Sequence, residues 1–258
     1  WRPTMTVDFG KTATDYGHHR QGFPSSMFDR LEPFGVGLAG QRVVDVGTGT
    51  GTVAREFALR GCHVIGIDPS TALLEQAHRL DAEFHVEVDH RVGSAEATGL
   101  DDGSVDVLSA GQCWHWFDRP AAVSEAARVV VPGGHVVICH FDWLPLPGTV
   151  VEATEELILE HNPGWEWSGS TGVHPEWLRD LAGGPFTSME TFSYDVDVEY
   201  SHEAWRGRIR ASAGVAASLP DDDVQRFDRA HRAMLDAQFP ADPLAIPHRV
   251  WVLVATRV

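Results

Sequence analysis

The chain has 258 residues, 43% of them hydrophobic, which fits one elaborated globular domain with a sizeable core. Its 20 basic and 37 acidic residues give a formal net charge of −17, which argues against a surface that binds nucleic acid by neutralising phosphates. No apolar run approaches the roughly 18 to 20 residues that span a bilayer, so we expect neither nucleic acid nor a membrane as a partner.

Three widely spaced cysteines bear on the compartment and on metal binding. Cys62, Cys113 and Cys139 form no Cys-x-x-Cys pair, and the N-terminus has no signal-peptide pattern, so we expect a reducing, cytoplasmic location. Cys113 with His115, and Cys139 with His140, offer metal-ligand side chains, but neither pair has the spacing of a structural zinc site. We therefore expect no metal.

Short apolar segments rich in β-branched residues alternate with helical patterns in the first part of the chain. In chain order, the predicted elements are a strand at 43–46, a helix at 52–60, a strand at 63–67, a helix at 70–81, a strand at 105–109, a helix at 118–131 and a strand at 135–139. Ser70 and Asp118 are expected to cap their helices, and Pro132 with the two glycines after it should end the third helix. The alternation predicts an α/β fold with an open, mostly parallel sheet.

From Leu144 onward the chain is richer in proline and tryptophan. We interpret this region as an insertion carried by the sheet rather than as a separate domain. The predicted elements here are a helix at 150–161, a strand at 188–200, helices at 204–219 and 222–239, and a last strand at 250–258.

The stretch VVDVGTGTGTVAREF contains Gly47, Gly49 and Gly51 between the first strand and the first helix. Glycine-rich turns at this point often bind an anionic or nucleotide ligand, although a tight turn that binds nothing has the same composition. A dinucleotide-binding turn reads G-x-G-x-x-G, and Thr52 stands where its third glycine belongs. The pattern therefore disfavours an NAD-dependent oxidoreductase.

Four segments resemble, in the same order, the motifs of class I S-adenosylmethionine-dependent methyltransferases, and together they cover about residues 40 to 140. They are DVGTGTG, VIGIDPS, VGSAEATGLDDGSVDVLSAGQCWHWFD and EAARVVVPGGHVVI. The resemblance implies a doubly wound, Rossmann-like sheet of seven strands with helices on both faces. It also implies S-adenosyl-L-methionine as the cofactor, which is converted to S-adenosyl-L-homocysteine.

The same resemblance assigns roles to individual residues. Asp45 would accept from the amino group of the cofactor, directly or through water, and Gly47 and Gly49 would lie beneath its methionine part. Asp68, 17 residues after Gly51, would accept from the ribose hydroxyls, although an Asp at a strand end also commonly caps a helix. The cofactor-binding residues implied for the core are Asp45, Gly47, Thr48, Gly49, Gly51, Asp68, Pro69, Ser94, Ala95, Glu96, Gly111, Gln112 and Trp116.

Two segments, AGQCWHWFD and DYGHHRQGFP, also resemble the subgroup that contains trans-aconitate methyltransferase and related small-molecule enzymes. In that subgroup an N-terminal segment folds over the cofactor, and the corresponding residues here are Tyr16, Arg20, Phe23 and Pro24, whereas Gln21 replaces a common proline. The implied organisation is a cover segment at 1–34, a cofactor-binding core at 35–144, helical insertions with the sixth strand at 145–247 as a lid over the acceptor, and a final strand at 248–258.

Catalytic candidates follow the fourth and fifth strands. His115 is the leading residue to face the acceptor, because the motif puts it beside the cofactor and imidazole titrates near neutral pH. His140 and Asp142 are second candidates, and a general base is needed only if the acceptor arrives protonated.

The expected partner is a small organic acceptor. The subgroup resemblance favours methylation at oxygen, in a hydroxyl or a carboxylate, over methylation at nitrogen or carbon. A noncatalytic S-adenosylmethionine-binding partner protein is the alternative from another class. No pattern in the sequence fixes an oligomeric state.

Overall fold

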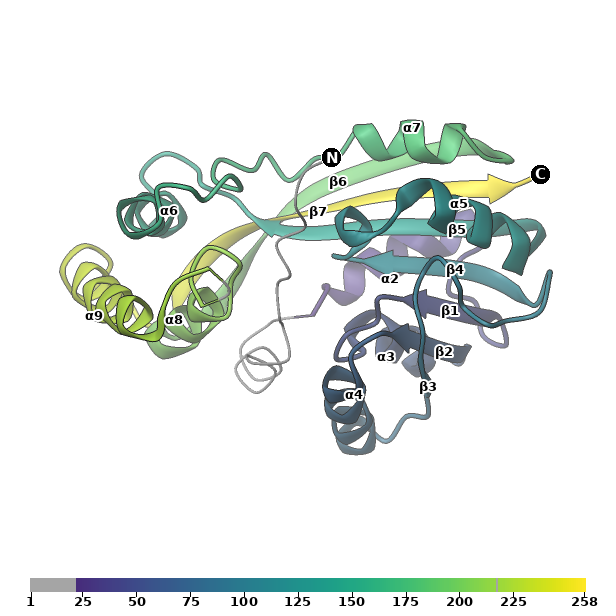
Figure 1. Ribbon diagram of the computed structural model, residues 1–258, viewed down its shortest axis with the longest axis horizontal. Coiled ribbons are helices and arrows are strands. Elements are labelled where there is room, and N and C mark those ends of the chain that lie inside the picture. Colours follow the sequence, from purple (N-terminus) through teal and green to yellow (C-terminus); the bar gives the residue numbers. More distant parts are fainter. Residues whose placement is uncertain (1–21, 217) are drawn as a thin grey trace. The chain divides into compact units, whose positions relative to one another are not determined.

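The computed structural model describes residues 22–216 and 218–258 (Figure 1). These residues divide into two units. Unit 1 contains residues 142–172 and 195–249 without residue 217, and unit 2 contains residues 22–141, 173–194 and 250–258. The predicted cover residues Tyr16 and Arg20 lie outside the described residues.

Seven strands form one sheet in the order β3-β2-β1-β4-β5-β7-β6, which confirms the predicted fold. The pairs β1–β2, β2–β3, β1–β4 and β4–β5 are parallel, and the sheet has one antiparallel edge. The strands are β1 (Arg42–Val46), β2 (His63–Asp68), β3 (Asp89–Val92), β4 (Val105–Gly111), β5 (Val130–Trp143), β6 (Phe186–Tyr200) and β7 (Leu244–Arg257). Because the strand order reverses between β1 and β4, ligands are expected outside the carboxyl ends of these strands.

The helices of unit 2 begin where the sequence predicts caps. The Ser70 hydroxyl accepts from the backbone N–H of Leu73 at 3.4 Å, and the Asp118 carboxylate accepts from that of Ala121 at 3.3 Å. Both predicted caps are thereby confirmed. The helices are α2 (Ser25–Leu31), α3 (Thr52–Leu59), α4 (Thr71–Phe84), α5 (Arg119–Val129) and α7 (Glu176–Ala182), with short 3₁₀ helices η2 (Glu32–Phe34) and η3 (Trp114–Trp116).

The helix predicted at 118–131 is too long, because β5 already begins at Val130 and continues through the proline-glycine segment. Val130 pairs with Val105 of β4, so strand pairing takes over from the helix there. Gly134 makes this possible: a Cβ at that position would lie 2.6 Å from the carbonyl oxygen of Asp106. Glycine thus lets the two backbones approach each other.

Unit 1 is built around three helices, α6 (Val150–His161), α8 (His202–Arg210) and α9 (Asp221–Gln238), and α9 contacts both of the others. The bounds of α6 are those predicted. The helix predicted at 204–219 is wrong beyond Arg210, because Gly214 packs so closely that a Cβ there would lie 3.0 Å from the Trp165 ring, and its carbonyl accepts from Asn162. These contacts hold the segment after α8 in a turn.

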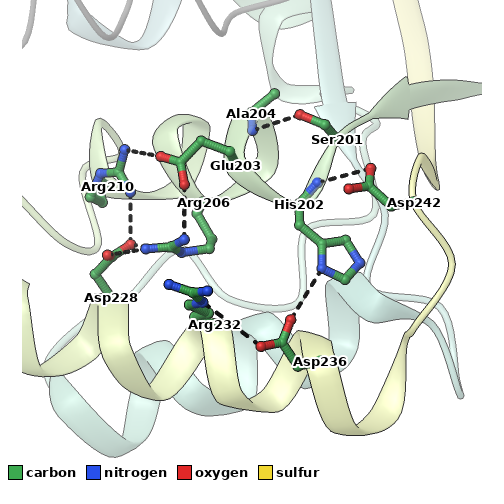
Figure 2. A network of polar contacts seen from close by, with 10 residues as sticks. All are labelled: Ser201, His202, Glu203, Ala204, Arg206, Arg210, Asp228, Arg232, Asp236 and Asp242. Atoms are coloured by element: carbon green, nitrogen blue, oxygen red, sulfur yellow. Dashed lines mark hydrogen bonds and ion pairs between the residues drawn. The ribbon is translucent and has the colours of Figure 1, made fainter.

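Each unit has its own hydrophobic core. The core of unit 2 unites residues of β1, β2, β4, β5 and β7 with residues of α5 and α7. The core of unit 1 surrounds Trp205 and Phe227, both fully buried. Arg206 and Arg210 of α8 both pair with Asp228 of α9 (Figure 2). In the described part of the chain, no helix combines the length and the apolar character that a bilayer-spanning helix needs.

Candidate functional site

The turn after β1 is shaped by the loop that follows β4. Gly47 has φ +65°, and a Cβ there would lie 2.8 Å from the Sγ atom of Cys113, so a side chain fits neither the backbone nor the space. Cys113 is fixed in turn, because its thiol donates to the carbonyl of Val46 at 3.2 Å. The absence of a side chain at Gly47 therefore lets the turn after β1 pack against Cys113, which lies far away in the sequence.

The second glycine of the turn borders open space. Gly49 has φ +56°, and among the described residues, its two chain neighbours aside, no atom lies within 4 Å of the position of its Cβ. Its backbone N–H donates to Oδ2 of Asp68 at 2.9 Å, while Oδ1 of Asp68 accepts from the backbone N–H of Ser70 at 2.8 Å. Burial raises the pKa of Asp68, and these two donors oppose the rise. Asp68 thus ties the glycine turn to the end of β2.

Asp45 lies deeper than the turn it precedes. Its side chain is only 1% exposed, and its Oδ1 accepts from the Ser109 hydroxyl at 2.7 Å. Burial raises the pKa of Asp45 to about 6, because an ionised carboxylate loses hydration in the sheet, although the bond from Ser109 favours the charged form. A carboxylate accepts up to about four hydrogen bonds, so Asp45 keeps capacity for a further donor.

The third glycine of the turn faces a buried polar cluster that the sequence analysis missed. A Cβ at Gly51 would lie 3.3 Å from Nη2 of Arg55 and 3.4 Å from Cε1 of His90. Arg55 Nε pairs with Asp81 Oδ1 at 2.9 Å, and the other oxygen of Asp81 bonds to His90 Nε2 at 2.7 Å. Arg55 also donates to the carbonyl of Thr50, within the turn, at 2.9 Å. We call Arg55, Asp81 and His90 the buried triad.

The sequence does carry a signal for this cluster. Asp81 follows Leu74 and Ala77 on the buried face of α4, and Arg55 lies among buried apolar residues of α3. A charge at an apolar position of an amphipathic helix indicates a buried ion pair. The partner of each charge, however, comes from another element and is not predicted by local pattern.

The segment after β4 adopts an unusual backbone. Gln112 has φ +64°, and its side-chain amide donates to the carbonyl of Phe141 while its backbone N–H donates to the carbonyl of Cys139 at 2.9 Å. A left-handed conformation at a non-glycine residue marks a backbone held by its surroundings, as is common at functional sites. These bonds fix the end of β4 to β5.

His115 stands on η3, which is anchored to α7. The neighbouring Trp114 is fully buried, and its indole N–H donates to Asp180 at 3.0 Å. The His115 ring lies 4.6 Å from the ring of Trp116 and 5.4 Å from that of His140, measured between centroids. His140 lies within β5 and not beyond it as predicted, because strand pairing extends that strand to Trp143. Two predicted catalytic candidates, one on η3 and one on β5, are therefore neighbours.

A third imidazole, which the sequence analysis missed, continues this row. The ring of His174 lies 4.4 Å from that of His140 and stacks on Trp177 at 4.1 Å and an interplanar angle of 3°. His174 is far from His140 in sequence, so only the fold brings them together. The tryptophan-rich segment GVHPEWL was the available signal, since it contains both His174 and Trp177.

The other predicted cofactor residues have diverse surroundings. The carboxylate of Glu96 accepts from the backbone N–H of Asp118 at 2.9 Å, and a Cβ at Gly111 would lie 2.6 Å from Val53. Trp116 is 44% exposed. Of the remaining predicted residues, Thr48 donates its backbone N–H to the carbonyl of Ile67, and Ser94 forms an isolated β-bridge with Ala97. Pro69 is exposed, and Ala95 is buried.

Known proteins resemble this chain in sequence and in fold. A family described as a methyltransferase domain matches residues 44–138. A ubiquinone biosynthesis O-methyltransferase of Azotobacter vinelandii is 31% identical over 187 residues, a match that covers 66% of this chain and 81% of that protein. The chain belongs to the class I S-adenosylmethionine-dependent methyltransferases.

Two further likenesses agree with this family. An uncharacterized methyltransferase of Mycobacterium bovis is 36% identical over 135 residues, and the match covers 52% of each chain, so this chain spans about half the length of that relative. A putative type II methyltransferase from Anaeromyxobacter dehalogenans superposes with a TM-score of 0.62 and 25% identity, over 92% of this chain and 97% of that one. The trans-aconitate subgroup stays a prediction.

S-adenosyl-L-methionine is the cofactor of this family, and the glycine turn of this methyltransferase fits such a group. The described part of the chain leaves space beside Gly49, and the carboxylate of Asp68 accepts from the backbone N–H of that residue. A ligand that approaches the backbone at Gly49 would thus meet an acceptor suited to hydroxyl groups. The individual cofactor contacts stay predictions.

Proposed function

We propose that this protein transfers a methyl group from S-adenosyl-L-methionine to an oxygen of a small organic acceptor, a hydroxyl or a carboxylate. The observation that carries the proposal is the relative named ubiquinone biosynthesis O-methyltransferase, of which the match covers 81%. Methylation at oxygen is also what the sequence motifs favour over methylation at nitrogen or carbon. The bound cofactor would supply an electrophilic methyl group on a positively charged sulfur.

The chain's own residues would have three tasks in this reaction. Gly49 and Asp68 would hold the cofactor, and the loop of Gln112 would fix the side of the site after β4. His115 would orient the acceptor and, for a hydroxyl acceptor, take up the proton that leaves when the new carbon–oxygen bond forms. The rings of His140 and His174 follow that of His115 in the row of imidazoles and would stabilise His115 in its protonated form.

The test is a search for the acceptor with isotope-labelled cofactor. Purified protein is incubated with labelled S-adenosyl-L-methionine and a panel of small molecules, and mass spectrometry locates the transferred methyl group. We expect label on an oxygen of a small acceptor. Label on nitrogen or carbon would contradict the proposed atom, and binding of S-adenosyl-L-homocysteine without transfer to any acceptor would favour a noncatalytic protein.

His115→Gln separates proton transfer from alignment. Glutamine keeps hydrogen-bonding capacity but takes up no proton near neutral pH, so with a hydroxyl acceptor we expect kcat to fall by roughly 10²-fold or more. An ionisation should also vanish from the pH profile. With a carboxylate acceptor no proton leaves, and the substitution should mainly raise KM. Unchanged kcat and KM at every pH would remove His115 from the site.

A further inference from the structure

The connection between β3 and β4, residues 93–104, lies wholly within unit 2 and within the described residues. It joins two parallel strands, and such connections usually contain a helix. Residues 93–104 form no helix, and Ser94 and Ala97 pair in an isolated β-bridge. The position of this β3–β4 connection must therefore be fixed by contacts with other elements.

Helix α5 supplies these contacts. Oε1 of Glu125, on α5, accepts from the backbone N–H of Thr98 at 2.8 Å and from the Thr98 hydroxyl at 2.6 Å. The same hydroxyl accepts from the backbone N–H of Leu100 at 3.3 Å. Closer to the start of the connection, the carboxylate of Glu96 accepts from the backbone N–H of Asp118, the N-cap of α5, at 2.9 Å. The connection is thus bound to α5 at two points, and a carboxylate accepts the bonds at each.

Glu125 is itself held in place. Arg128 donates to both of its carboxylate oxygens, from Nε and from Nη2, each at 2.8 Å. The bonds from Arg128 and from Thr98 lower the pKa of Glu125 to about 2, although burial opposes the decrease. Glu125 and Thr98 are both buried, so a rotation of the Glu125 side chain would leave the donors of Thr98 without an acceptor. The bond between them therefore fixes one conformation of the connection.

The start of the connection borders the predicted cofactor site. The backbone N–H of Gly93 donates to the carbonyl of Asp68 at 3.2 Å, and the carboxylate of Asp68 accepts from Gly49 of the glycine turn. The glycine turn follows β1, Asp68 ends β2 and the connection follows β3, and these strands are neighbours in the order β3-β2-β1. Asp68 therefore lies between the glycine turn and the β3–β4 connection.

This order relates the connection to one part of the cofactor. In S-adenosyl-L-methionine the ribose lies between the methionine part and the adenine. With the methionine part at the glycine turn and the ribose hydroxyls at Asp68, as the motifs predict, the adenine falls on the start of the connection, at residues 94–97. We propose that Glu125 is a positioning residue for the adenine: by holding Thr98, it fixes residues 94–97 where they meet the base. The proposal concerns the cofactor and does not depend on the identity of the methyl acceptor.

Calorimetry with two cofactor analogues that differ only in the base tests the proposal on the full chain. The probes are S-adenosyl-L-homocysteine, which carries adenine, and S-inosyl-L-homocysteine, which carries hypoxanthine. A site whose groups are fixed to bind the edge of adenine rejects a base with a different hydrogen-bonding edge. We therefore expect wild type to bind the adenine probe at least about tenfold more tightly. Equal affinity for the two probes, or binding of neither, overturns the proposal.

Substitutions of Thr98 separate positioning from stability. Thr98→Val removes the hydroxyl that Glu125 holds and nearly keeps the shape of the side chain, so we expect the preference for adenine to fall at least about fivefold. Thr98→Ser keeps the hydroxyl and should keep the preference. A merely structural role would lower the melting temperature and leave the ratio of the two affinities unchanged. An unchanged ratio in folded Thr98→Val, or an equal fall in Thr98→Ser, contradicts the proposal.

Glu125→Gln tests the carboxylate itself. The amide has one acceptor oxygen in place of two and cannot serve all the donors of Thr98 and Arg128, so the preference for adenine should fall as in Thr98→Val. Asp102→Asn is the matched control, since it also removes a carboxylate that pairs with Arg128, at 2.6 Å, but one whose side chain is 80% exposed. An equal fall of the preference in Asp102→Asn would overturn the proposal. If Glu125→Gln fails to fold, the comparison of Thr98→Val with Thr98→Ser decides.

Discussion

Gly47 and Gly49 show that two glycines of one motif can be required for different reasons. Gly47 is confined by Cys113, whereas no atom of residues 22–216 or 218–258, chain neighbours aside, lies within 4 Å of a Cβ at Gly49. A side chain at Gly49 would therefore disturb no neighbour and would project into the space where we expect the cofactor. Backbone strain from φ +56° is the remaining cost, and it can be measured separately with another glycine.

Gly49→Val should weaken binding of S-adenosyl-L-homocysteine at least about tenfold, because the valine side chain would occupy space that the ligand needs. Gly103→Val is the matched control, since Gly103 has φ +57° and also has no atom within 4 Å of its Cβ position. We expect calorimetry to show normal binding by Gly103→Val and similar losses of thermal stability in both variants. Equal binding by the two variants would mean that Gly49 serves only the turn.

At Asp45, the requirement of ligand binding opposes the stability of the fold. Its pKa of about 6 lies above that of an unfolded Asp, so its ionised form is disfavoured in the fold. Asp45→Asn should therefore stabilise the ligand-free protein near neutral pH, by as much as about 3 kcal/mol. The same change should weaken cofactor binding if Asp45 accepts from the amino group. Urea unfolding and calorimetry measure the two effects, and a destabilised variant would contradict the first.

At the scale of elements, the buried triad links α3, α4 and β3 beneath the glycine turn. Gly66 of β2 makes room for it, because a Cβ there would lie 2.6 Å from Nδ1 of His90. The triad holds the carbonyl of Thr50 through Arg55, so it supports the backbone of the glycine turn. Disruption of the triad should therefore lower both the free energy of unfolding and the affinity for the cofactor.

Asp81→Asn should cost about 3–5 kcal/mol of unfolding free energy, because it leaves the buried Arg55 without its carboxylate. Asp106→Asn is the control, since it breaks the pair with Arg42, whose side chain is 49% exposed, and should cost no more than about 1 kcal/mol. Urea denaturation measures both. Similar losses in the two variants would show that burial of the triad adds nothing to its strength.

The sequence predicts the elements of the sheet better than it predicts the contacts between them. Strand β2 and helix α6 follow their predicted ranges closely, because apolar periodicity and cap residues are local signals. Helix α7 is missed because it has only seven residues and follows Pro175 in a segment rich in tryptophan. Strand β5 extends beyond the prediction at both ends, since strand pairing overrides a proline-glycine segment.

The same difference between local signals and tertiary contacts applies to the candidate site. The motif locates Gly49 and Asp68 in the sequence, and the structure joins them by a hydrogen bond. Ser109 is the partner of Asp45, and His174 is the neighbour of His140. Both come from distant segments, and no local pattern predicts either contact. Resemblance to a family identifies residues of a motif, whereas the environment that tunes them depends on tertiary packing.

At the scale of the whole molecule, two buried histidines of unit 1 and the buried Asp45 of unit 2 respond to pH in opposite directions. In unit 1, burial lowers the pKa of His231 to about 3 and that of His248 to about 4. In unit 2, burial raises the pKa of Asp45 to about 6. The histidines stabilise the fold when neutral, and Asp45 stabilises it when protonated.

The pH dependence of each unit follows from these directions. The lowered histidine pKa values give stability that is present above about pH 6.5 and is lost as the pH falls, about 2 kcal/mol for each histidine between about pH 7 and pH 5. The raised pKa of Asp45 gives stability that is lost as the pH rises through about 6, so unit 2 gains about 1 kcal/mol from that group over the same interval.

Amide hydrogen exchange, followed by mass spectrometry and corrected for intrinsic pH dependence, measures this difference unit by unit. On acidification to about pH 5, we expect protection in α6 and α9 to fall while protection in β1 and β4 is kept or rises. His231→Gln should reduce the loss in unit 1, because the glutamine amide can replace the hydrogen bond between the His231 ring and the Thr154 hydroxyl, 3.2 Å in length, and cannot take up a proton. A uniform loss of protection in both units, unchanged by His231→Gln, would show that other groups govern the acid response.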